Sequence, residues 1–167
     1  MTNTATLEAE KPANKHYRAK ADPIHRILVV EDDPDIRRLN TEVLIHYGYD
    51  VDAAEDGELA WAALTTQDYD LMITDNNMPK VTGVQLLKKM HGARMALPVI
   101  MATGIEPMWE FKQNPLIVPA AMLLKPYTVA ELLGTVKSVL RASLNPDEPI
   151  VPPLYQHSPP FPNRLEL

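Results

Sequence analysis

The chain has no cysteine, no long apolar run and no excess of positive charge. Without cysteine it cannot form disulfide bonds, hold zinc or an iron–sulfur cluster through sulfur, or use a thiol nucleophile. No apolar run approaches the roughly 20 residues of a membrane-spanning helix, and residues 1–21 lack the apolar stretch of a signal peptide. With 16 basic against 22 acidic residues and a formal net charge of -6, binding to nucleic acid or to a membrane surface is not expected. We therefore expect a cytoplasmic protein with no membrane association.

The distribution of proline and apolar residues divides the 167 residues into three parts. Residues 1–25 are polar and have no sustained apolar period, which predicts a disordered N-terminal arm. Seven of the 16 prolines fall in the last 23 residues, so residues 144–167 are predicted to form an extended, polyproline-II-like tail. This tail is interpreted as a passive extension or as a ligand for an aromatic groove. Residues 26–143 remain as one folded domain.

Within residues 26–143, short apolar runs alternate with segments of helical period. The apolar runs have the character of strands buried on both faces, and they cover residues 27–30, 51–54, 71–74, 99–102 and 122–124. Between the last two runs, three prolines leave room for only about two helical turns, over residues 108–113. The alternation predicts right-handed βαβ crossovers and an α/β fold with a doubly wound, five-stranded parallel sheet.

The first and last helices have recognisable ends. Asp33 as N-cap and Pro34 at the first helical position predict a helix start, and Gly48 predicts its end. Asp33 is therefore interpreted as a cap rather than as a metal ligand. Thr128 is predicted to cap the last helix. The apolar period of the first helix includes Ile36, Leu39, Val43 and Leu44.

Polar side chains follow four of the five predicted strands. These residues are Glu31, Asp32, Asp75, Thr103 and Lys125. Because ligands of doubly wound sheets bind at the carboxyl ends of the strands, we expect these side chains to meet at one edge. Oxygen ligands in a small acidic cleft suit Mg²⁺. A carboxylate there is a candidate nucleophile toward phosphorus, and a hydroxyl and an ammonium can hold phosphoryl oxygens, so the predicted chemistry is phosphoryl transfer to an aspartate.

Four segments at these strand ends carry a resemblance to a known family. ILVVEDD, LMITDNNMP, VIMATG and LLKPY resemble the four signature segments of the response regulator receiver domain, the CheY-like fold. The resemblance covers about residues 26–142. It implies a (βα)5 flavodoxin-like fold with the strand order 2-1-3-4-5. The proline-interrupted segment 107–119 then takes the place of the usual fourth helix, which is expected to be irregular.

The resemblance also implies the residues of a metal and phosphoacceptor site. Asp75 corresponds to the phosphoacceptor and is also a metal ligand. Asp32 corresponds to a direct Mg²⁺ ligand and Glu31 to a ligand that acts through water. The backbone carbonyl of Asn77 completes the protein's share of the metal ligands.

The same resemblance assigns phosphoryl-binding roles and shows one departure from the family pattern. Thr103 corresponds to the hydroxyl that binds the phosphoryl group, and Lys125 to the lysine that pairs with it. The bond between Lys125 and Pro126 is commonly cis in the family. The switch position, three residues before this lysine, usually holds a tyrosine or phenylalanine. Here it is Met122, a flexible apolar residue, so output is expected to depend more on the loop after Thr103.

In function, the resemblance implies a single-domain response regulator of a two-component phosphorelay. A sensor histidine kinase or a phosphotransfer protein would supply the phosphoryl group. The chain would catalyse only its own phosphorylation and dephosphorylation, and so would not act as an enzyme on other substrates. Because no effector domain is expected after the last helix, output would pass through an unidentified protein target rather than DNA. The sequence leaves open whether a homodimer forms.

Two other functions fit part of the pattern. The chain could be a receiver-like scaffold that is not phosphorylated, although every expected chemical group is present. It could also be an Mg²⁺-dependent phosphohydrolase with an aspartyl nucleophile. Such enzymes commonly have a second carboxylate two residues after the nucleophile, which acts as general acid and base. Here that residue is Asn77, which cannot transfer protons in this way, so the phosphohydrolase is the weaker alternative.

Overall fold

The computed structural model describes residues 24–104 and 108–144. Its elements are β1 (Arg26–Val30), α1 (Pro34–His46), β2 (Asp50–Ala54), α2 (Gly57–Thr66), β3 (Leu71–Thr74), α3 (Gly83–Gly92), β4 (Val99–Thr103), α4 (Met108–Gln113), β5 (Ala121–Leu124) and α5 (Val129–Leu144). The strands form one parallel sheet in the order β2-β1-β3-β4-β5. The predicted doubly wound fold and its strand order are therefore confirmed, and α4 has the six residues predicted for it.

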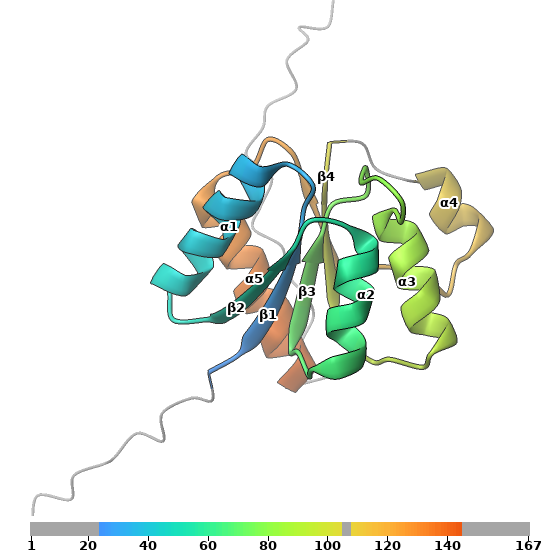
Figure 1. Cartoon of the computed structure of the whole chain (residues 1–167), viewed down its shortest axis with the longest axis horizontal. Coiled ribbons are helices and arrows are strands. Elements are labelled where there is room, and N and C mark those ends of the chain that lie inside the picture. The colour runs from blue at the N-terminus through green and yellow to red at the C-terminus, as the bar shows by residue number, and fades with distance from the viewer. Residues whose placement is uncertain (1–23, 105–107, 145–167) are drawn as a thin grey trace, which may run out of the picture.

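Helices cover both faces of the sheet, and successive residues of a strand point to opposite faces, so both sets of side chains are buried. In β1, Ile27 and Val29 pack in the core formed with α1 and α5, whereas Leu28 and Val30 pack in the core formed with α2 and α3. All four side chains are at most 1% exposed. Figure 1 shows the same division, with α1 and α5 on one side of the sheet and α2, α3 and α4 on the other. This two-sided burial explains why the strands are continuous apolar runs.

The predicted helix ends are confirmed by their hydrogen bonds. The Asp33 carboxylate accepts from two backbone N–H groups in the first turn of α1, at 2.9 and 3.1 Å. At the start of α5, the Thr128 N–H donates to the Glu131 carboxylate (2.6 Å) and the Glu131 N–H donates to the Thr128 hydroxyl (3.2 Å). This reciprocal pair is a capping box. Gly48 follows the C-cap of α1 with φ at 90°, a left-handed conformation that favours glycine.

Only part of the apolar period of α1 is buried. Leu44 is fully buried, but Leu39, which belongs to the same period, is 55% exposed. A helix that packs on one face of a sheet buries one stripe of its surface, and Leu39 lies outside that stripe. Together with Ile36, Leu39 instead borders a surface groove beside Lys125. The apolar period of α1 therefore contains both core residues and surface residues.

Charged and aromatic side chains join the strands at the amino-terminal edge of the sheet. Arg26 Nη2 lies 2.7 Å from Asp52 Oδ2, and the Tyr69 hydroxyl donates to the same oxygen at 2.8 Å. The guanidinium of Arg26 lies 5.3 Å from the centre of the Tyr69 ring. Burial, and then the hydrogen bond to Asp52, raise the pKa of Tyr69 to about 12.

Tyr69 is expected to make the stability of the fold decline between about pH 10 and about pH 12. In the unfolded chain a tyrosine loses its proton near pH 10, whereas folded Tyr69 keeps its proton up to about pH 12. Its stabilising contribution is therefore complete below pH 10 and is lost as the pH rises through this window. Urea unfolding at several pH values gives the free energy of unfolding as a function of pH. Between about pH 10 and about pH 12 this free energy should fall less steeply for Tyr69→Phe than for the wild type, and the difference in slope should correspond to at most about one bound proton. Equal slopes would contradict the assignment.

Some sequence predictions concern residues outside the described ranges. These are most of the predicted N-terminal arm (residues 1–23), most of the predicted tail (residues 145–167) and part of the loop after Thr103 (residues 105–107). Among the helices that the structure does describe, none combines the length and the apolar character needed to cross a membrane.

Candidate functional site

Three carboxylates meet at the carboxyl-terminal edge of the sheet, where the sequence predicted them. Glu31 and Asp32 follow β1 and Asp75 follows β3, and these two strands are neighbours in the sheet. Each residue offers one oxygen, and the three oxygens lie within 4.8 Å of one another. Glu31 is 2% exposed and Asp75 is 7% exposed, whereas Asp32 is exposed. The cluster therefore has two buried carboxylates and one that faces solvent.

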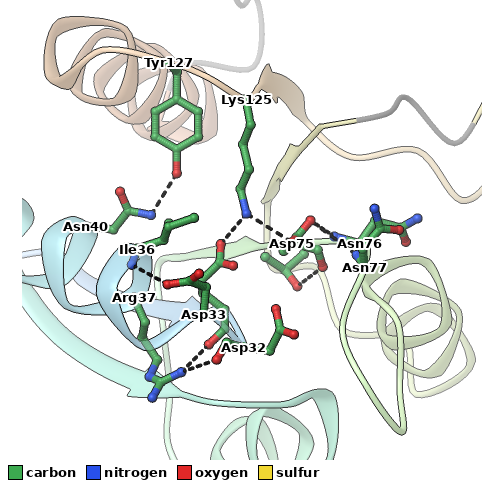
Figure 2. Close-up of polar contacts among 12 residues, drawn as sticks. Asp32, Asp33, Ile36, Arg37, Asn40, Asp75, Asn76, Asn77, Lys125 and Tyr127 are labelled. Atoms are coloured by element: carbon green, nitrogen blue, oxygen red, sulfur yellow. Dashed lines mark hydrogen bonds and ion pairs between the residues drawn. The ribbon is translucent and has the colours of Figure 1, made fainter.

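Lys125 places a positive charge between the two buried carboxylates. Its Nζ lies 2.6 Å from Glu31 Oε2 and 3.0 Å from Asp75 Oδ2, and Figure 2 shows the side chain extending toward Asp75. Burial acts to lower the pKa of Lys125, but the hydrogen bonds to Glu31 and Asp75 outweigh it and the pKa lies above its usual value. For Glu31, burial raises the pKa even though Lys125 opposes the shift. At Glu31 the effect of burial on the pKa therefore outweighs the opposing effect of the Lys125 ammonium.

Thr103 and Lys125 are joined through the backbone at the ends of β4 and β5. Thr103 is fully buried and pairs with Leu124 in the register of the two strands. Its carbonyl accepts a hydrogen bond from the Lys125 N–H at 2.9 Å. The Lys125–Pro126 peptide bond is cis, as the resemblance implied. The five strand-end residues predicted from the sequence thus lie at one edge of the sheet.

The Asp75 carboxylate is held on two sides. Its Oδ1 accepts from the backbone N–H groups of Asn76 (2.6 Å) and Asn77 (3.3 Å), while Oδ2 faces Lys125. The buried amide of Asn76 accepts in turn from a backbone N–H in the first turn of α3, at 3.0 Å. Gly83, the first residue of α3, lies directly against the Asp75 carbonyl. The position of the Asp75 carboxylate therefore depends on where α3 begins.

Two contacts beside the site were not predicted from the sequence. The Arg37 guanidinium donates to the backbone carbonyls of Glu31 (2.6 Å) and Asp32 (3.1 Å), which fixes the turn between β1 and α1. The Asn40 amide donates to the Tyr127 hydroxyl at 2.8 Å and joins α1 to the segment after β5 (Figure 2). Asn40 and Tyr127 are 87 residues apart, so no local pattern could have revealed their contact.

A further unpredicted ion pair links the loop after Asp75 to α2. Lys80 Nζ contacts the carboxylate of Asp56, a buried residue that also caps α2 through two backbone N–H groups at 2.9 Å. The hydrogen bond from Lys80 holds the pKa of Asp56 below its usual value. Lys80 has φ at 64°, the left-handed conformation that residues other than glycine adopt rarely. The ion pair and the turn fix the loop that carries Asn76 and Asn77.

Met122, predicted as the switch position, lies in β5 opposite Met101 of β4. It is partly buried and packs against the core shared with α2 and α3. It therefore lies on the same side of the sheet as α4. Its strand, β5, ends just before Lys125, and the neighbouring strand, β4, ends at Thr103. Its role as a switch stays a prediction.

Comparison with known proteins identifies the family. Residues 27–137, which are most of the described part of the chain, match the family described as the response regulator receiver domain. The chain belongs to this family. The chain is 37% identical over 122 residues to the response regulator RppA of Synechocystis sp. This match covers 71% of this chain and 51% of RppA. It is 29% identical over 116 residues to the transcriptional regulatory protein CusR of Escherichia coli K12, covering 70% of this chain and 51% of CusR.

Solved structures of receiver domains are similar over the same region. The chemotaxis response regulator CheY4 of Vibrio cholerae is 29% identical, with a TM-score of 0.62, over 70% of this chain and 98% of CheY4. A CheY-like receiver domain protein of Methanospirillum hungatei is 27% identical, with a TM-score of 0.68, over 72% of this chain and 97% of that protein. The response regulator TrrA of Thermotoga maritima, solved in complex with Mg²⁺-BeF, is 30% identical with a TM-score of 0.61, over 70% and 99%.

The match to the curated relatives is partial in length. The chain spans 51% of the length of RppA and of CusR, and 19% of the protein RcaC of Microchaete diplosiphon, to which it is 29% identical over 126 residues and 75% of its own length. What is shared is the receiver domain of two-component response regulators, a signalling domain.

Proposed function

We propose that this receiver domain is a cytoplasmic phosphorylation switch in which Asp75 accepts a phosphoryl group from a sensor histidine kinase or a phosphotransfer protein. The observation that carries the proposal is the fixed Asp75 carboxylate, with two backbone N–H groups at one oxygen and Lys125 at the other. During transfer, a carboxylate oxygen forms a bond to phosphorus while the bond between phosphorus and the donor imidazole breaks. The electron pair of that bond stays on the imidazole nitrogen.

The charge and the ligand chemistry of the site fit Mg²⁺. Three carboxylates at −1 and one ammonium at +1 leave a formal charge of −2, and Mg²⁺ prefers oxygen ligands of this kind. We assign Asp32 and Asp75 as direct ligands, Glu31 as a ligand through water and the Asn77 carbonyl as the last protein ligand. When bound, the ion neutralises charge on the transferred phosphoryl group. The complex of TrrA with Mg²⁺-BeF supports this assignment.

Phosphorylation would change the charge that Thr103 and Lys125 face. A phosphoryl group carries a charge of about −1.5 to −2 and three acceptor oxygens. The unmodified Asp75 carboxylate carries a formal charge of −1. Lys125 is placed to pair with a phosphoryl oxygen, since its Nζ already lies 3.0 Å from Asp75. We assign the Thr103 hydroxyl as the second phosphoryl-binding group. Its movement toward the phosphoryl group would shift the loop after β4, and the signal would pass to a protein target through that surface.

Intact mass after incubation with acetyl phosphate and Mg²⁺ tests the proposal. The wild-type chain should gain about 80 Da, the mass of one HPO₃ group, and the gain should require Mg²⁺ and disappear in Asp75→Asn. Asp68→Asn, an exposed aspartate outside the site, is the matched control and should be phosphorylated like the wild type. An adduct that persists in Asp75→Asn would place the acceptor elsewhere. No adduct in a folded chain that binds Mg²⁺ would favour an unphosphorylated scaffold.

We propose that the phosphodonor protein binds the groove beside Lys125. The groove has a volume of about 400 Å³, and its lining is mostly apolar, with Ile36, Leu39, Asn40, Lys125, Pro126 and Tyr127. Leu39 leaves 55% of its surface exposed there. Exposed apolar surface of this kind favours a protein contact. Because Lys125 belongs both to the groove and to the site, a protein bound in the groove would lie directly beside Asp75.

Leu39→Lys is expected to slow phosphotransfer from a protein donor by about tenfold, the effect of losing one apolar anchor at an interface. Phosphorylation by acetyl phosphate should keep its rate, because the groups that hold the Asp75 carboxylate are the N–H groups of Asn76 and Asn77 and the ammonium of Lys125. Ile45→Lys provides the control, since Ile45 is 54% exposed on the same helix but lies outside the groove. The measurement uses the purified histidine kinase, chosen from a panel, that phosphorylates the wild-type chain fastest. Equal slowing by both variants would argue against docking in this groove.

A further inference from the structure

A second groove lies at the edge of the sheet opposite Asp75. It has a volume of about 460 Å³ and lies among the end of α3, the segment that leads into β4, the segment between α4 and β5, and the last turn of α5. Most of the residues that line it have apolar side chains, including Met90, Met95, Leu97, Leu116 and Val118, and polar backbone and side-chain atoms share the lining with them. Leu116 is 80% exposed and Val118 is 62% exposed. Nothing in the phosphoacceptor site uses this surface.

We propose that residues 150–155 of the same chain, with the sequence IVPPLY, bind in this groove. The described structure ends at the groove, because Ser143 forms part of its lining and Leu144 is the last residue of α5. Residues 145–149 then connect the helix to Ile150. Five extended residues span at most about 17 Å, which is longer than a groove of this volume is wide. The segment can therefore reach the groove without any change in α5.

The chemistry of the segment matches that of the groove. Ile150, Val151, Leu154 and Tyr155 supply large apolar or aromatic side chains, which suit a groove lined by methionine, leucine and valine. The two prolines between them fix φ, so the segment loses less conformational entropy when it binds than a flexible segment would. A segment of this kind can bury the side chains of Leu116 and Val118 that the described structure leaves exposed.

Charge and connectivity favour the same occupant. Asp147 and Glu148 precede the apolar segment, and the exposed Arg94 lies directly before the groove residue Met95. Opposite charges at the entry of the segment support this orientation. A short tether also gives the segment an effective concentration of about millimolar at the groove. A contact between the segment and the groove would therefore form within one molecule even if its dissociation constant were only somewhat below this concentration.

Methionine methyl resonances can test the contact in the full chain. Met90 and Met95 line the groove, whereas Met72 and Met101 are fully buried in the sheet and serve as internal controls. In ¹³C-methyl-labelled protein, ending the chain after Leu144 should shift the Met90 and Met95 signals and leave the two control signals in place. Serine at the four apolar positions of residues 150–155 should reproduce the truncated spectrum. The polar-tail variant Gln156→Ser with Asn163→Ser should reproduce the full-length spectrum.

Other outcomes would overturn the proposal. Identical Met90 and Met95 signals in the full and truncated chains would mean that the groove is open to a different partner. Signals that return to the truncated positions on dilution would mean that the segment of a second copy binds there. Val118→Lys should remove the effect of truncation, whereas Ile45→Lys, at a position on α1 that is 54% exposed against 62% for Val118, should preserve it. Asp75→Asn should leave the contact intact, so this test and the phosphorylation test can fail independently.

Discussion

Lys125→Met is expected to slow phosphorylation of Asp75 by about 100- to 1,000-fold, the cost of losing one charged donor to the transferring group. Without Mg²⁺ it is also expected to lower the free energy of unfolding by about 3 kcal/mol, as for other broken buried ion pairs. The Lys125 side chain is 19% exposed, and its ammonium lies within 3.0 Å of both Glu31 and Asp75. Methionine preserves the apolar stem of the side chain but leaves three carboxylates within 4.8 Å of one another.

The stability loss in Lys125→Met should depend on pH and on Mg²⁺. Burial already raises the pKa of Glu31, and Lys125 opposes that shift, so its removal should raise the pKa further. A carboxyl with a raised pKa stabilises the fold when it is protonated, and this contribution is lost as the pH rises through the folded-state pKa. The variant should therefore approach the wild type in stability as the pH falls toward the usual glutamate pKa. Added Mg²⁺ should reduce the difference in stability between the variant and the wild type at neutral pH, because the ion replaces the missing positive charge.

Urea unfolding with and without Mg²⁺, at neutral and at mildly acidic pH, measures both effects. Lys137→Met is the control, since Lys137 is exposed on α5 away from the site and its loss should change stability by at most about 0.5 kcal/mol. A stability loss that is the same at every pH and unaffected by Mg²⁺ would mean that Lys125 acts by packing alone. Wild-type phosphorylation rates in Lys125→Met would remove Lys125 from the phosphoryl-binding role.

The candidate site could be predicted from the sequence because of the geometry of parallel sheets. Asp75 and Lys125 are 50 residues apart, yet each follows a strand of the same parallel sheet. Once the strands are recognised from their apolar runs, their carboxyl ends must meet at one edge. The caps at Asp33 and Thr128 were equally predictable, since a cap depends on residues within one helical turn.

The remaining features depend on packing that no local pattern contains. The sequence placed Lys125 at the site but did not show that its ammonium would bridge Glu31 and Asp75. Leu39 fits the helical period of α1 as well as Leu44 does, and only the position of the helix on the sheet decides which one is exposed. The close approach of Gly83 to Asp75 and Asn76 likewise depends on how closely α3 approaches the end of β3.

That close approach predicts a second large effect. Gly83→Ala is expected to lower the free energy of unfolding by about 1–3 kcal/mol, the usual range for overpacking, and to slow phosphorylation of Asp75. A Cβ at Gly83 would lie 2.4 Å from the Asp75 carbonyl oxygen and 3.1 Å from the Asn76 Cα. Both are backbone atoms, so no side-chain rotation can relieve the contact. The start of α3 and the backbone of Asp75 and Asn76 must separate, which disturbs the hydrogen bonds that hold Asp75 Oδ1.

Gly92→Ala makes the same chemical change at the other end of α3, where a Cβ would have no neighbour within 4 Å. It should be neutral or stabilising by about 0.4–1 kcal/mol, because alanine reduces the conformational entropy of the unfolded chain. Urea unfolding and the initial rate of phosphorylation by acetyl phosphate, measured on both variants, separate an effect on stability from an effect on the position of Asp75. Equal stabilities of Gly83→Ala and Gly92→Ala would mean that α3 and the backbone of Asp75 and Asn76 move apart at little cost in free energy. Lower stability of Gly83→Ala with a wild-type rate would mean that α3 supports the fold without positioning Asp75. A fall in both stability and rate would mean that the start of this helix positions the Asp75 carboxylate.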